Sequence, residues 1–127
     1  MNAKILSLFL LFITFSVSAQ EGDGMIYDSP AQMPTFPGGG AAMDQYLQEN
    51  LVYPANTKAN GIQGKVYVQF IVEKDGRITN VEVRRGVNEE LDAEAMRLVK
   101  EMPNWKPGSN RGKIVRTRYT LPIIFRI

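Results

Sequence analysis

The sequence of 127 residues contains no cysteine and no histidine. The missing cysteines exclude disulfides, a lipid-modified cysteine and a thiol site. Without histidine as well, the usual imidazole and thiolate ligands of a catalytic metal are absent. Beyond residue 19 the only serines are Ser29 and Ser109, so no nucleophile with an adjacent base can be assembled. We therefore predict that the protein is not an enzyme and that it binds no metal and no cofactor.

A strong excess of one charge is also lacking, because 15 basic residues stand against 13 acidic ones and the net charge is +2. This balance predicts no nucleic-acid partner. The three glycines at 38–40 precede a helical pattern, but no Lys-Ser or Lys-Thr pair follows them as in a phosphate-binding loop. We interpret these glycines as a helix entry and expect no small-molecule substrate.

The longest apolar run, residues 5–17, has 13 residues and would span about 20 Å as a helix. A bilayer core needs roughly 30 Å. Lys4 precedes the run and small residues up to Ala19 follow it, which is typical of a secretory signal peptide. We predict export and cleavage after Ala19; retention of residues 1–19 would instead anchor the chain in the inner membrane.

Residues 20–36 mix glycine, proline and acids without periodicity, which predicts a flexible leader before a folded domain over residues 37–127. Apolar residues spaced by three and four predict helices over residues 41–51 and 88–102. A short helical turn is expected over residues 54–60. Asn88 or Asp92 is the candidate cap of the later helix, and the acids of its first turn fit the helix dipole better than a metal site.

Alternation of apolar and polar residues predicts three strands. The first two form a hairpin around residues 74–77, with a bulge between Ile78 and Val81. The first strand turns Val66, Val68, Phe70 and Val72 to one face. The last strand, over residues 114–127, turns one set inward (Val115, Tyr119, Leu121, Ile123 and Phe125) and the other outward (Arg116, Arg118, Thr120, Pro122 and Arg126), with Ile114 and Ile124 exposed.

Pro122 has no N–H to donate, so a proline at this point is confined to an edge strand or a bulge. Residues two apart in a strand direct their backbone groups to the same side. Arg118, Thr120 and Pro122 therefore share one flank, and we assign that flank to an open edge that can accept a guest strand.

These elements predict an α+β fold in which two helices pack on one face of a small three-stranded antiparallel sheet. A helical crossover would place the last strand beside the first. The spatial order would then be second, first, third, with the last strand at the edge.

Five landmarks resemble the C-terminal domain of TonB, the energy transducer of the Gram-negative envelope, over residues 37–127. They are Tyr53-Pro54, the strand opening at residues 61–66, Asp75-Gly76-Arg77 in a turn, Trp105-Lys106-Pro107-Gly108 after the later helix, and the apolar last strand. Residues 36–39 and 46–50 are similar to a Bacteroidetes-type, stand-alone version of this domain.

The resemblance implies a periplasmic module for energy-coupled transmembrane transport. Such a module captures the N-terminal box of TonB-dependent outer-membrane transporters by β-strand addition to its last strand. The implied partner-binding residues on that strand are Arg116, Arg118, Thr120, Pro122, Ile124 and Arg126. The family's segment before Tyr-Pro also faces the transporter plug, which adds Asn50 and Tyr53, although Asn50-Leu51 stands where the family often has Gln-Pro.

The chain lacks the long proline-rich span of the full transducer, so a released domain would hold a transporter without pulling on it. Two roles other than this binding module stay open. If residues 1–19 are retained, the chain would be a membrane-anchored transducer. Alternatively, two copies could pair through their edge strands as a structural homodimer of the envelope.

Overall fold

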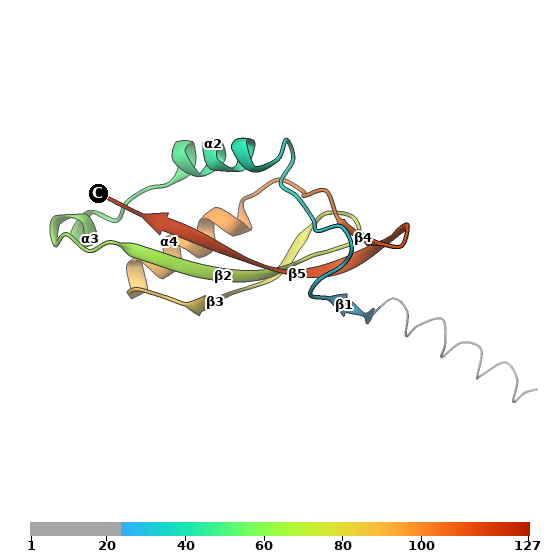
Figure 1. The fold of residues 1–127 in the computed structure, drawn as a ribbon. Helices are drawn as coiled ribbons and strands as arrows, with labels where there is room; N and C mark the ends of the chain where they lie inside the picture. Colours follow the sequence, from blue (N-terminus) through green and yellow to red (C-terminus); the bar gives the residue numbers. More distant parts are fainter. Residues whose placement is uncertain (1–23) are drawn as a thin grey trace, which may run out of the picture.

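The structure is a computed structural model that describes residues 24–127, and its helices and strands are labelled in Figure 1. The elements in chain order are β1 (Ile26–Tyr27), α2 (Gly40–Asn50), α3 (Ala55–Ala59), β2 (Gly64–Val72), β3 (Ile78–Arg85), α4 (Glu89–Lys100), β4 (Gly108–Asn110) and β5 (Lys113–Phe125). The predicted signal peptide, residues 1–19, lies outside the described residues. Between residues 24 and 127, no helix is long and apolar enough to cross a membrane.

The sheet has the strand order β1-β5-β2-β3, and β4 pairs with β5 outside that path. β2 pairs antiparallel with both β3 and β5, so the predicted α+β fold and its three-stranded core are confirmed. The sheet is larger than predicted because β1 and β4 join it. These strands have two and three residues, which is too short for a periodic pattern to be recognised.

The core fills the space between the sheet and the helices, with α2 and α4 on the same side (Figure 1). The predicted inner faces of β2 and β5 and the apolar stripe of α4 are all confirmed. The buried side chains on these elements are Val66, Val68, Phe70, Val72, Leu91, Ala95, Leu98, Val99, Leu121, Ile123 and Phe125. Between the two cap candidates, Asn88 is the one that accepts the hydrogen bond of the Leu91 N–H, at 2.9 Å.

The described part of the predicted flexible leader is not a free tether. β1 pairs in parallel with β5, and two single-residue bridges follow it, Gln32–Ser109 and Thr35–Lys106. Phe36 is buried among the core side chains. These contacts come from isolated residues. The segment therefore shows no hydrophobic periodicity from which its docking could be predicted. The ordered chain therefore begins well before Pro37, which corrects the prediction for residues 24–36.

Gly76 joins the β2–β3 turn to the loop that carries Trp105. Its backbone has φ of +90°, a left-handed conformation that favours glycine. The carbonyl of Gly76 accepts a hydrogen bond from the Trp105 N–H at 2.8 Å. A Cβ at this position would lie 2.3 Å from the Trp105 carbonyl oxygen, so the close approach leaves no room for a side chain.

We expect Gly76→Ala to lower the free energy of unfolding by about 3 kcal/mol or more, because it combines left-handed strain with a backbone clash. Gly112→Ala is the matched control, since Gly112 has φ of +79° and open space around it. Gly112→Ala should lower the free energy of unfolding only by the left-handed strain, about 1–2 kcal/mol. Urea unfolding of both variants measures the difference, and equal losses would show that the contact with Trp105 does not constrain the turn.

Candidate partner-binding site

The two flanks of β5 have different neighbours. Residues 117–125 pair with β2 on one flank, while β1 lies on the other flank beside Arg116 and Thr117. Among the described residues, no segment pairs with residues 118–125 on the flank away from β2. The free part of the edge is therefore shorter than β5 itself, because the leader covers its beginning.

Pro122 indicates which backbone groups face this free flank. It lies opposite Tyr67 of β2. Because proline has no N–H, the ladder with β2 loses nothing only if the backbone of Pro122 faces away from β2. By alternation, the backbone groups of Arg118, Thr120 and Ile124 then face away from β2 as well. The free flank thus offers alternating N–H and C=O groups, with one N–H missing at Pro122.

A groove of about 200 Å³ lies beside this flank, between α2 and β5. Leu47 and Leu51 line it from the helix side, and Ile123 and Ile124 line it from the strand. Asp44 and Gln48 also line the groove. Neighbouring strands of a sheet lie about 4.8 Å apart. A strand added to β5 would consequently place some of its side chains against this largely apolar lining.

The side chains of Thr120, Pro122, Ile124 and Arg126 are all exposed, as predicted for the outward face of the last strand. Arg118 is also partly exposed, but its guanidinium donates to a carboxylate oxygen of Asp28 at 2.6 Å. Arg118 is the arginine nearest the start of the free flank, and it is therefore already paired with an aspartate of the leader.

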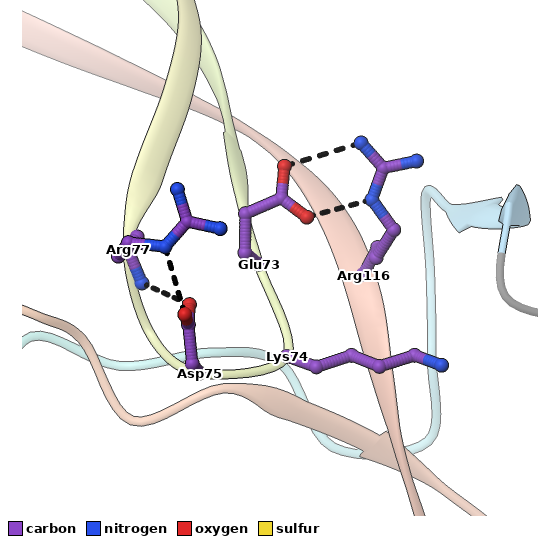
Figure 2. A pocket seen from close by; sticks show the side chains of 5 residues that line it. All are labelled: Glu73, Lys74, Asp75, Arg77 and Arg116. Carbon is purple, nitrogen blue, oxygen red and sulfur yellow. Dashed lines mark hydrogen bonds and ion pairs between the residues drawn. The ribbon is translucent and has the colours of Figure 1, made fainter.

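Arg116 is held by contacts within the chain. Figure 2 shows its guanidinium facing the Glu73 carboxylate, with Nε at 2.7 Å and Nη2 at 3.1 Å from the two oxygens. The hydrogen bond from Arg116 lowers the pKa of Glu73 below its ordinary value, although burial opposes the shift. Arg116 also donates to the carbonyl of Gly24 at 3.2 Å. Its side chain thus links β5 to the residue that follows β2 and to the leader.

The pocket around this pair has a volume of about 420 Å³ and is lined by Glu73, Lys74, Asp75, Arg77 and Arg116 (Figure 2). Asp75 pairs with Arg77 at 2.7 Å, so both carboxylates of the pocket are bound to arginines. The part of the chain from residue 24 onward contains no cluster of acidic side chains that could hold a metal ion. We interpret the pocket as an ion-pair network that closes the β2–β3 turn.

The two residues predicted before the first strand have different surroundings. Asn50 is exposed, and its side-chain amide donates to the Tyr46 carbonyl at 2.8 Å. Tyr53 is half-buried, its hydroxyl donates to the Ile62 carbonyl, and its ring packs edge-on against Phe125 at 5.8 Å. Asn50 is therefore accessible to a partner, whereas Tyr53 supports β5 from the inside.

Sequence reasoning missed Glu94, a carboxylate with only 9% exposure on α4. Arg97 donates to both of its oxygens at 2.8 Å, and the Val52 N–H donates at 2.7 Å. Burial raises the pKa of Glu94, but these hydrogen bonds outweigh it and lower the pKa overall. Arg97 also donates to the Asn50 carbonyl at 2.8 Å, so the pair fixes the segment after α2. The spacing of three between Glu94 and Arg97 was the available signal.

Three comparisons relate the chain to known proteins. The family described as "Gram-negative bacterial TonB protein C-terminal" matches residues 49–127. Protein TonB of Pseudomonas aeruginosa is 33% identical over 76 residues, which is 60% of this chain and 22% of that protein. The solution structure of the Helicobacter pylori TonB C-terminal domain has a TM-score of 0.51 at 21% identity, over 66% of this chain and 76% of that one. The chain thus spans about a fifth of the length of its curated relative, and the likeness to the solved structure supports the fold.

We expect Glu73→Gln to lower the free energy of unfolding by about 1–2 kcal/mol at neutral pH, because it removes a charge-assisted hydrogen bond. The pKa of Glu73 is lower in the folded chain than its ordinary value of 4.5. Its contribution is therefore complete above that ordinary value and is lost as the pH falls through the folded pKa.

Urea unfolding from pH 7 down to acid measures this dependence. Glu82→Gln is the control, because Glu82 pairs with Arg84 in an exposed position where an ion pair contributes little. The difference between wild type and Glu73→Gln should shrink in acid. A difference that stays constant or grows in acid would contradict the assignment.

Proposed function

Since the chain belongs to the family of Gram-negative bacterial TonB protein C-terminal domains, we propose that it is a binding module for TonB-dependent outer-membrane transporters. In this proposal the N-terminal box of the transporter adds as a strand to the free flank of β5. The module acts in the periplasm and takes part in energy-coupled transport.

The observation that carries the proposal is the unpaired flank at residues 118–125, whose other side is fully paired with β2. A guest strand there would form about four backbone hydrogen bonds, each worth roughly 0.5–1.5 kcal/mol net. Ordering a flexible peptide consumes part of this energy. We therefore expect weak and reversible capture.

Side chains around the flank add selectivity. Successive guest side chains alternate between the two faces of the sheet. Those on the helix side would meet Leu47 and Leu51 in the groove, which favours apolar residues. Those on the outer face would lie near Arg118 and Arg126, which favours acidic residues and faster encounter.

In this proposal the module holds the transporter through the strand that it captures. The expectation that it has no enzyme activity and takes no cofactor remains a prediction.

We expect Thr120→Pro to weaken guest binding by about tenfold, because it removes one outward N–H and places a ring where the guest would lie. The fold should survive, since Pro122 is already tolerated two residues further along. Thr120→Val keeps the N–H and is the matched control. The probe is a peptide of alternating valine and threonine with a glutamate at each end.

Amide chemical shifts measured by NMR during a peptide titration report the binding site. The amides of residues 118–126 should respond in wild type and in Thr120→Val. Binding that is unchanged in a folded Thr120→Pro variant, or that moves shifts elsewhere, would refute strand addition. A persistent dimer in sedimentation, with no uptake of peptide, would favour the structural homodimer instead.

A further inference from the structure

β1 lies on the same flank of β5 that the guest strand of the proposed function would use. Ile26 is in register with Arg116, and Tyr27 with Thr117, in a parallel pair. The leader precedes residues 49–127, the part of the chain that matches the family. The chain therefore carries its own short strand at the start of the site.

The pairing of β1 with β5 and two polar contacts hold residues 24–28 in place. Asp28 pairs with Arg118 at 2.6 Å, and the Gly24 carbonyl accepts from Arg116 at 3.2 Å. Ile26 also lines a small cavity of about 180 Å³ together with Ile71 of β2. Ile71 belongs to the outer, helix-free face of the sheet and yet is only 5% exposed. The leader thus supplies an apolar side chain and a carboxylate two positions apart.

The interactions that keep β1 on β5 are weaker than those that anchor the rest of the leader. The Asp28 side chain is 70% exposed, and an ion pair this exposed adds little to stability. Residues 30–36 are anchored by buried Pro30, Pro34 and Phe36 and by the two bridges to the β4 region. Residues 24–28 can therefore leave β5 while the following segment stays docked.

We propose that residues 24–28 compete with the guest strand for β5, and that the best guest reproduces their chemistry. Such a guest carries a branched apolar residue that replaces Ile26 at the cavity that Ile71 also lines. Two positions later it carries a carboxylate that replaces Asp28 at Arg118. Its remaining residues continue along the free flank. This inference rests on the proposed function and specifies both the guest and its competitor.

An acetylated peptide of sequence IYDVTVT is the probe, and IYNVTVT is its neutral counterpart. Ile26→Pro disrupts β1, and Asp28→Asn removes its ion pair. Both variants should bind IYDVTVT at least about threefold more tightly than wild type, because the flank is occupied less often. Glu89→Gln is the charge control: it removes one acidic charge at the first residue of α4 and should bind IYDVTVT as wild type does. On Asp28→Asn, the neutral peptide should bind about threefold more weakly than IYDVTVT.

Hydrogen exchange supplies a second measurement on the full wild-type chain. Saturation with IYDVTVT should accelerate exchange at the amides of residues 25–28. If these amides stay protected, or if wild type and Ile26→Pro bind equally, the leader is not a competitor. Weaker binding by both variants would make the leader part of the guest's site and would also overturn the inference. If no folded variant binds either peptide, strand addition itself fails.

Discussion

Each backbone N–H and C=O of a strand can serve only one neighbouring strand, and this limit governs what β5 can do. One set of its groups is used by β2 along residues 117–125. The other set is divided between β1 at the beginning of the strand and a free flank along the remainder. Pro122 has no N–H, and its backbone faces the free flank. No strand of the described chain pairs with β5 there, so no hydrogen bond is lost.

The flank can remain free because β5 is stabilised from elsewhere. Its inner side chains are buried in the core, and Tyr119 joins an aromatic cluster with Phe70 and Trp105 at ring distances of 5.0–5.7 Å. Trp105 is buried at 3% exposure, and its indole N–H has no hydrogen-bond partner among the described residues. Packing alone therefore holds this ring. Tyr53 and the Glu94–Arg97 pair fix the segment between α2 and α3, which keeps the groove beside β5 in shape.

The elements with a repeating pattern could be predicted from the sequence, and those built from single contacts could not. The faces of β2 and β5, the stripe of α4 and the bulge near Asn80 follow from alternation or spacing, and the structure confirms them. Pro122 predicts an open flank on β5, and residues 118–125 have one within the described chain, but β1 covers the start of that flank. The sequence could not show that Arg116 and Arg118 already have partners, because Glu73 and Asp28 are 43 and 90 residues away. For the same reason the sequence predicts a flexible tether where the leader is in fact docked.

A long free edge is an aggregation hazard, and this chain limits the hazard with devices that do not close the site. Pro122 removes one donor, and the outward Arg126 and Arg118 place charge beside the flank, as edge strands often do. β1 covers only the first two positions of the flank, where Arg116 and Arg118 are available to hold it. A longer leader strand would protect the edge more completely but would also exclude a guest. The two-residue length of β1 thus balances protection of the edge against access to it.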